Sequence, residues 1–257
     1  MTEPQAAPRR VALFATCLVE TMRPSVGFAT LKLLKTAGVE VVVPPGQTCC
    51  GQPQYNSGDR AGAKRLAKRV IAEFEPFAAV VIPSGSCAGM VRVHYPELFE
   101  DEPDWARRAA ALAEKTFELT QFLVDVLKVS AVPGRHPGAV AYHDSCSSRR
   151  EMHVHAQPRA LLAAAGAEVR DVENAEDCCG FGGTFCVKMA DVSGAMVDAK
   201  AQAAIATGAD TLLAGDLGCL LNIAGRLKRL GSPIAVRHIA EVLAGEPAAP
   251  GIGETRK

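Results

Sequence analysis

The sequence has no net charge and no long apolar run. Its 28 basic residues are balanced by 28 acidic ones, so the chain as a whole lacks the basic character typical of nucleic-acid-binding proteins. No stretch approaches the roughly 20 apolar residues that a membrane span requires. Residues 1–10 include two arginines but lead into no uninterrupted apolar segment of the kind found in secretory signals. We therefore expect a cytoplasmic protein with no membrane span and no nucleic-acid partner.

The composition excludes both a disordered chain and a small disulfide-stabilised scaffold. Hydrophobic residues make up 48% and charged residues 22% of the sequence, which is ordinary for a globular protein. A chain of 257 residues buries enough surface to hold a core without disulfides. In a reducing compartment the nine cysteines therefore indicate metal or redox chemistry more than structural disulfides.

Eight of the nine cysteines form two sets with nearly the same spacing. Each set reads Cys, thirty-one residues, Cys-Cys, then thirty-six or thirty-nine residues of which the first is Gly, and a last Cys. The first three cysteines of the two sets lie 129 residues apart, and the last ones 132. Only Cys186 stands outside, and we expect it to be a buried small residue or an accessory thiol. The two sets are Cys17, Cys49, Cys50 and Cys87, and Cys146, Cys178, Cys179 and Cys219.

The residues around the cysteines repeat as well, which indicates an internal duplication. Residues 11–13 match 140–142, residues 37–41 match 165–169, and residues 117–123 resemble 237–243. We expect a first half from residue 1 to 130, which includes a linker helix over about 104–128 with Asp104 as its N-cap. The second half is expected from residue 131 to 257, with a flexible C-terminal tail from about Gly245.

Each half alternates short apolar runs with stretches of helical spacing, which predicts an α/β fold. We expect two pseudo-symmetric Rossmann-like halves, each a small parallel sheet flanked by helices. The run at residues 39–43 is continuously apolar, as in a strand buried on both faces. The predicted strands are 10–15, 39–43, 78–82, 139–143, 167–172 and 210–214. The predicted helices are 25–37, 59–75, 158–165 and 188–207.

In both halves the cysteines come just after predicted strands. Because parallel strands end at the same edge of a sheet, their carboxyl ends form the usual ligand site of open α/β folds. We therefore predict two separate four-thiol sites, one in each half. Four inert buried cysteines are the alternative in each half, since free cysteine is often buried. Two matched quartets that each contain a vicinal pair argue against that alternative.

Four thiols in one place favour a metal centre, because thiolate is the ligand form of cysteine. All-cysteine coordination suits either zinc or an iron–sulfur cluster, and spacing alone leaves both open. Gly51 and Gly180 directly follow the vicinal pairs, where they allow backbone angles or close approaches that a Cβ would block.

Two sequence motifs resemble the cysteine-rich CCG-domain family. Residues 49–53 read Cys-Cys-Gly-Gln-Pro, and residues 178–185 read Cys-Cys-Gly-Phe-Gly-Gly-Thr-Phe. Residues 83–87 and 143–146 fit the family pattern too, and the similarity extends from about residue 10 to 244. The family includes the small cysteine-rich component of heterodisulfide reductase (HdrB), the iron–sulfur component of glycolate oxidase and the lactate-utilisation protein A group, which the motifs resemble most.

The resemblance implies an iron–sulfur electron-transfer component, an oxidoreductase subunit, in a multi-protein system that oxidises L-lactate to pyruvate. Its partners would be the other subunits, including a ferredoxin-like iron–sulfur protein. It also implies that each cysteine quartet holds a cluster, with zinc as the alternative; it assigns no catalytic residue. The implied ligands are Cys17, Cys49, Cys50 and Cys87 for the first cluster, and Cys146, Cys178, Cys179 and Cys219 for the second.

The sequence departs from the reductase members, which have a fifth thiol three residues after the last cysteine of each half. Met90 and Asn222 stand at those positions. Ordinary 4Fe–4S clusters with four thiols are therefore expected rather than non-cubane ones. A cluster-dependent heterodisulfide or thiol reductase and a zinc-stabilised, non-redox interaction module remain as alternative functions. His143 is expected to pack near the second site or to support its ligands.

Overall fold

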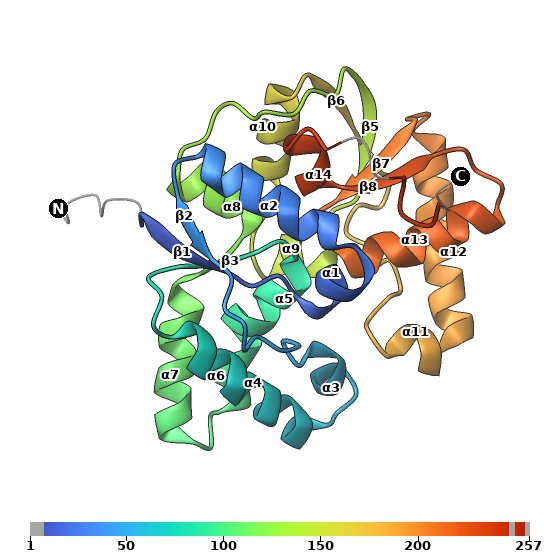
Figure 1. Cartoon of the computed structure of the whole chain (residues 1–257). Coiled ribbons are helices and arrows are strands. Elements are labelled where there is room, and N and C mark those ends of the chain that lie inside the picture. Colours follow the sequence, from blue (N-terminus) through green and yellow to red (C-terminus); the bar gives the residue numbers. More distant parts are fainter. Residues whose placement is uncertain (1–7, 247–249, 255–257) are drawn as a thin grey trace.

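The computed structural model describes residues 8–246 and 250–254, and within them it contains two four-stranded sheets (Figure 1). All strand pairs are parallel, and the orders are β2-β1-β3-β4 and β6-β5-β7-β8, so the second sheet repeats the topology of the first. The α/β fold with two Rossmann-like halves is therefore confirmed. The strands are β1 (Arg10–Leu13), β2 (Glu40–Val42), β3 (Val80–Ile82), β4 (Thr116–Glu118), β5 (Gly138–Tyr142), β6 (Ala167–Asp171), β7 (Thr211–Ala214) and β8 (Ala235–His238).

Helices connect successive strands within each half. The first half contains α1 (Cys17–Met22), α2 (Pro24–Thr36), α3 (Gln52–Asn56), α4 (Arg60–Phe74), α5 (Gly85–Gly89), a π-helical turn η1 (Met90–His94), α6 (Tyr95–Leu98), α7 (Pro103–Glu114), α8 (Leu119–Gln121) and a second π-helical turn η2 (Phe122–Val126). The second half contains α9 (Cys146–Arg150), α10 (Ala156–Ala164), α11 (Phe185–Lys188), α12 (Ala190–Ala206), α13 (Leu217–Arg229) and α14 (Ile239–Leu243).

The predicted linker helix over residues 104–128 is wrong. The helix α7 ends at Glu114, and the chain then forms β4, which pairs with β3, before it turns into α8. The apolar spacing is helical on both sides of β4, but residues 116–118 complete the sheet. Nor does Asp104 cap the helix: Glu102 stands at the N-cap, because Pro103 occupies the first helical turn.

The strand β2 differs from its prediction in burial. Because it is the outer strand of the first sheet, it has a hydrogen-bonded neighbour on one side only. Its residues are half-buried or exposed, and the next residue, Val43, is also exposed. The expectation that residues 39–43 are buried on both faces is therefore wrong: a continuous apolar run does not distinguish an edge strand from a central one.

The two halves share one hydrophobic core. The larger cluster of buried side chains includes residues of β1 and α2 together with residues of β5, β7 and α13. Helix α2 also packs against α14, and the two lie beside each other in Figure 1. At this contact the guanidinium of Arg23 donates to the buried carboxylate of Glu241 at 2.8 Å. The boundary near residue 130 therefore stays a prediction, since the core does not divide there.

The described part of the predicted flexible tail packs against the second sheet, and its flexibility stays a prediction. Ile252 is buried, and its N–H donates to the carbonyl of Val236 in β8 at 2.7 Å. Arg23 also donates to the carbonyl of Pro250. The rest of the predicted tail, residues 247–249 and 255–257, lies outside the described residues, and so do residues 1–7. Of the helices in the described ranges, none combines the length and apolar character that crossing a membrane requires.

Candidate metal centre

The eight cysteines of the two quartets all lie at the carboxyl edges of the two sheets. In the first half, Cys17 begins α1 after β1, the vicinal pair follows β2, and Cys87 lies in α5 after β3. In the second half, Cys146 begins α9 after β5, and Cys219 lies in α13 after β7. The parallel topology therefore brings together residues up to 70 positions apart in the first half and 73 in the second, as the sequence predicted.

In the first half the four sulfurs form a chain of contacts. The Sγ atoms of Cys50 and Cys87 are 3.4 Å apart. Cys49 accepts hydrogen bonds from the thiols of Cys17 and Cys50, which lower its pKa to about 3. The same contacts raise the pKa of Cys17 and, with burial, that of Cys50. Four sulfurs held in contact in this way are the arrangement expected of ligands that bind a metal ion as thiolates.

The second half repeats this arrangement. Cys178 accepts hydrogen bonds from Cys146 and Cys179, which lower its pKa to about 2, and the pKa of each donor is raised. A hydrogen bond from Cys179 favours the thiolate of Cys219, but burial and the charge of Asp216 outweigh it and raise the pKa of that thiol. The two quartets therefore have the same order of sulfur contacts.

The two quartets line neighbouring cavities. The first cavity has a volume of about 240 Å³ and is bordered by all four thiols of the first half. The second has a volume of about 280 Å³ and is bordered by Cys146, Cys178, Cys179 and Cys219 of the second half. Both cavities lie between the halves, and they share a wall. The shared residues are Gln52, Ser86, Phe181, Gly183 and Asp216.

Asp216 is the charged residue of this shared wall. It stands at the N-cap of α13 but makes no side-chain hydrogen bond to that helix. Its carboxylate instead accepts from the N–H of Ser86 at 2.8 Å and from the hydroxyl of Ser84, both in the other half. Its charge adds to the Cys178 contact and the burial that raise the pKa of Cys146, and to the burial that raises the pKa of Cys219. Asp216 therefore fixes the two cysteine loops relative to each other and places a negative charge beside both cavities.

The vicinal cysteines depend on the glycine that follows each pair. Gly51 and Gly180 have φ angles of +85° and +79°, in the left-handed region that favours glycine. This conformation turns each backbone N–H toward the first cysteine of the pair, so that Gly51 donates to Cys49 Sγ and Gly180 donates to Cys178 Sγ, both at 3.4 Å. A backbone donor of this kind stabilises a thiolate in each site.

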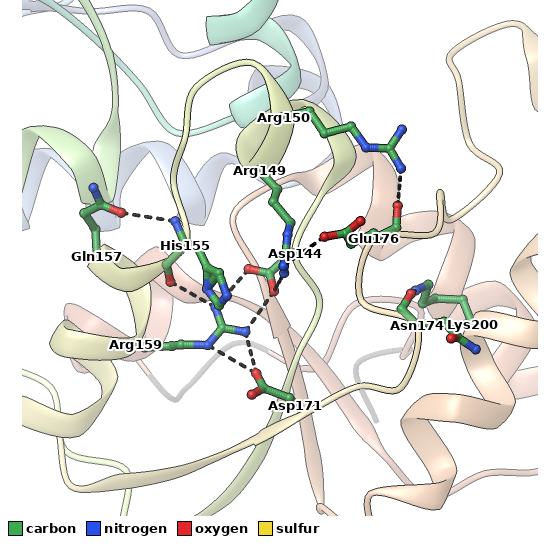
Figure 2. A network of polar contacts seen from close by, with 10 residues as sticks. All are labelled: Asp144, Arg149, Arg150, His155, Gln157, Arg159, Asp171, Asn174, Glu176 and Lys200. Carbon is green, nitrogen blue, oxygen red and sulfur yellow. Dashed lines mark hydrogen bonds and ion pairs between the residues drawn. The ribbon is translucent and has the colours of Figure 1, made fainter.

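A network of ionic contacts supports the second site (Figure 2). Asp144, two residues before Cys146, is 2% exposed and receives two hydrogen bonds from Arg159, at 2.9 and 2.8 Å. Such a bidentate pair fixes both partners. Arg159 also contacts Asp171 at the end of β6, so the network joins the strand ends that carry the first and second cysteine loops of this half.

Basic side chains also hold the loop that leads to Cys178. Arg150 donates to the carbonyl of Glu176, and Lys200 donates to the carbonyl of Asn174 at 2.6 Å (Figure 2). Lys200 is 3% exposed, although lysine is rarely buried. A further cavity of about 390 Å³ on this side is lined by Lys200 and Cys178. The second site therefore borders a buried cation as well as the space between the halves.

His143 lies against the second site. It is 1% exposed, and a ring nitrogen, Cys179 Sγ and Cys219 Sγ all lie within 4.8 Å of one another. Neither ring nitrogen has a hydrogen-bond partner among the residues that the structure describes. Burial and the charge of Lys200 lower the pKa of His143 to about 4. The position of His143 near this site agrees with the sequence prediction, but its unpartnered nitrogens were not predicted.

The other sequence-predicted residues lie outside the two quartets. The Sγ of Cys186 donates to the carbonyl of Gly183, and neither cavity is lined by Cys186. Met90 is fully buried in the smaller core cluster, and Asn222 donates to the carbonyl of Cys179 at 2.9 Å. The residues that replace the fifth thiols therefore have structural contacts of their own.

Asp216 and Lys200 were not predicted from the sequence. A comparison of the halves contains a signal for Asp216, which stands three residues before the last cysteine where the first half has Ser84. For Lys200 the comparison of the halves is a weaker guide, because α4 and α12 differ in length.

The donor set fits a metal ion or cluster. Each site offers four sulfurs in mutual contact, a backbone N–H directed at one of them, and a cavity beside them. The unpartnered nitrogens of His143 are an independent sign of a missing partner beside the sulfurs of Cys179 and Cys219. Cysteine sulfurs are the ligands that zinc and iron–sulfur clusters prefer.

Comparisons with known proteins agree with this geometry. The cysteine-rich CCG domain matches the chain twice, at residues 11–92 and 140–224. Lactate utilization protein A of Bacillus thuringiensis (strain Al Hakam) is 50% identical over 235 residues, which cover 91% of this chain and 98% of that protein. Lactate utilization protein A 1 of Bacillus cereus (strain Q1) matches equally.

A solved structure supports the fold. The crystal structure of a hypothetical protein from Helicobacter pylori superposes with a TM-score of 0.67 at 13% identity, and the match covers 98% of this chain and 51% of that one. At this identity the likeness concerns the fold alone. Together, the repeated cysteine motif and the 50% identity identify the family. The chain belongs to the lactate utilization protein A family of cysteine-rich CCG-domain proteins.

Proposed function

We propose that the protein is an electron-transfer component of a system that oxidises L-lactate to pyruvate, and that it holds two 4Fe–4S clusters. The observation that carries this proposal is the pair of four-thiol sites whose cavities share a wall. The names of the relatives supply the substrate of the system. The residues proposed to hold the clusters are Cys17, Cys49, Cys50 and Cys87, and Cys146, Cys178, Cys179 and Cys219.

The cavities favour a cluster over a single zinc ion. A structural zinc site is closed, because four sulfurs surround the ion at about 2.3 Å. Here the thiols border cavities of about 240 and 280 Å³, several times the roughly 30 Å³ that one water occupies in the liquid. Space of this size suits a group that brings its own sulfide atoms, and four cysteine thiolates are the usual ligands of a cubane.

When bound, such clusters accept and release single electrons. The part of this chain is to hold them at fixed positions and to keep bulk water from them. Cys50 and Cys179 are almost fully buried, whereas Cys49 and Cys178 are half-buried and accept hydrogen bonds from backbone N–H groups. Each site therefore has one protected side and one side nearer to solvent, from which a partner can exchange electrons.

Two neighbouring sites match the stoichiometry of lactate oxidation. The conversion of L-lactate to pyruvate releases two electrons and two protons, and each 4Fe–4S cluster carries one electron. The two sites together can hold the pair of electrons from one lactate before a partner removes them. We assign the oxidation of lactate itself to a partner protein, and the exchange of electrons to a ferredoxin-like iron–sulfur partner.

Complementation tests this proposal. A Bacillus cereus strain that lacks its lactate utilization protein A would receive the wild-type chain, a Cys50→Ser variant, a Cys179→Ser variant or a Cys186→Ser control. We expect wild type and the Cys186→Ser control to restore growth on L-lactate, and the other two to fail despite equal protein levels. Growth on glucose should be the same for all four strains. Growth on L-lactate with either site variant would contradict the proposal.

A further inference from the structure

The two thiol sites differ at one fully buried position. The first strands of the halves, β1 and β5, pair in the same register with β3 and β7, so the residue after β1 corresponds to the residue after β5. That residue is Phe14 in the first half and His143 in the second, and they are 0% and 1% exposed. Phe14 packs on the ring of Phe74. The first site therefore has an aromatic hydrocarbon where the second has an imidazole.

The imidazole of His143 lacks the partners that a buried polar ring requires. An unsatisfied buried donor or acceptor destabilises the folded state, so native proteins rarely retain one without a function or a missing partner. In either protonation state the ring carries at least one N–H. The sulfurs of Cys179 and Cys219 lie within 4.8 Å of a ring nitrogen. A sulfur atom of the group held by these two cysteines is therefore the partner that the geometry supplies.

A second difference between the two sites also places a polar, hydrogen-bearing group beside the second site. Gly51 approaches the backbone of Ala63 in α4, and Gly180 approaches the backbone of Ser193 in α12, so these two helix positions correspond. Seven residues later, the first half has buried Val70 and the second has buried Lys200. The second site therefore lies beside a buried ammonium group, and the first beside an aliphatic side chain.

From this contrast we propose that His143, assisted by Lys200, sets the reduction potential of the second site above that of the first. Reduction adds one negative charge to a cluster and its thiolates. A hydrogen bond to a sulfur and a nearby positive charge both stabilise that charge, and both raise the potential. An electron that enters the first site then moves to the second, so that the first site is oxidised as the second is reduced.

Acidic groups near the second site act in the opposite direction. Asp216 borders both cavities, and the N–H of Ser86 and the hydroxyl of Ser84 already partner its carboxylate. Asp177 faces Lys200 from an exposed position at the rim, where solvent screens its charge. Phe14, at the position of His143 in the first half, offers no N–H to a sulfur, which is why the proposed hydrogen bond from His143 favours the second site.

The inference rests on the proposed clusters, and its test separates the two. The full-length protein is reconstituted anaerobically, its iron and sulfide are counted, and the midpoint potential of each cluster is measured by electron paramagnetic resonance during a dithionite titration. The variants are His143→Phe, which gives the second half the residue of the first, the reciprocal Phe14→His, and His143→Gln, which keeps an N–H donor. Lys200→Met tests the charge separately.

We expect two midpoints in the wild type, with His143→Phe lowering only the higher one. A lost hydrogen bond that changes the ratio of reduced to oxidised cluster tenfold at fixed potential corresponds to about 59 mV for a one-electron couple. Phe14→His should raise the lower midpoint, His143→Gln should retain part of the higher one, and Lys200→Met should lower it. An unchanged higher midpoint in His143→Phe, with iron and sulfide retained, would overturn this inference alone. Zinc without sulfide in the wild type would overturn the proposed function as well.

Discussion

Replacing Gly180 with alanine should destabilise the protein far more than the same change at Gly51. Both glycines have positive φ angles, and the left-handed conformation costs an alanine about 1–2 kcal/mol. At Gly180 the new Cβ would also lie 2.8 Å from the backbone oxygen of Ser193, a contact that forces α12 to shift. Overpacking of this kind costs about 1–3 kcal/mol more. At Gly51 the nearest atom, the Ala63 oxygen, is 3.4 Å away.

The total expected loss is therefore about 2–5 kcal/mol for Gly180→Ala and about 1–2 kcal/mol for Gly51→Ala. Gly166→Ala is the matched control, because Gly166 has a φ angle of +85° and no atom near its absent Cβ. Urea denaturation under reducing, anaerobic conditions compares the three variants through their unfolding midpoints and slopes. The reasoning is refuted if Gly180→Ala loses no more stability than Gly166→Ala, or if Gly51→Ala loses as much as Gly180→Ala.

Two further predictions concern contacts between the halves. Arg23→Met leaves the carboxylate of Glu241 buried without its cation, so the free energy of unfolding from a urea titration should fall by about 3–5 kcal/mol. Lys32→Met, which breaks an exposed ion pair, should lower it by less than about 1 kcal/mol. Equal losses in the two variants would contradict the account. The hydrogen bond to Glu151 raises the pKa of His94 above its ordinary value of 6.5. A raised folded-state pKa stabilises the protein fully below pH 6.5, and the gain is lost as the pH rises through the folded-state pKa. The stability difference between wild type and Glu151→Gln, less than about 1 kcal/mol, should therefore shrink from pH 6 to pH 8; a constant difference would exclude His94 as its source.

The cysteine site could be predicted because its geometry follows from chain order. Cys17, the vicinal pair and Cys87 each follow a strand, and parallel strands place their carboxyl ends on one edge. No detail of side-chain packing is needed for that inference. The internal repeat then predicts a second site of the same kind, because the second half has the same strand order as the first.

What the sequence did not reveal depends on contacts between distant segments. The carboxylate of Asp216 binds the N–H of Ser86 in the first turn of α5, 130 residues earlier, although an aspartate before a helix ordinarily predicts a cap for its own helix. The edge strands β4 and β8 are short, and in β4 the helical spacing of the flanking residues hides the strand. Likewise, the burial of Lys200 is decided by the loop that its ammonium group holds, which composition and periodicity do not show.

The central claim is that two thiol quartets hold two iron–sulfur clusters, and metal analysis of the anaerobically purified chain tests it most directly. The account predicts about eight irons and eight sulfides per chain. In Cys50→Ser and in Cys179→Ser both numbers should fall to about half, while Cys186→Ser should match the wild type. One or two zinc ions per chain with no sulfide would contradict the claim.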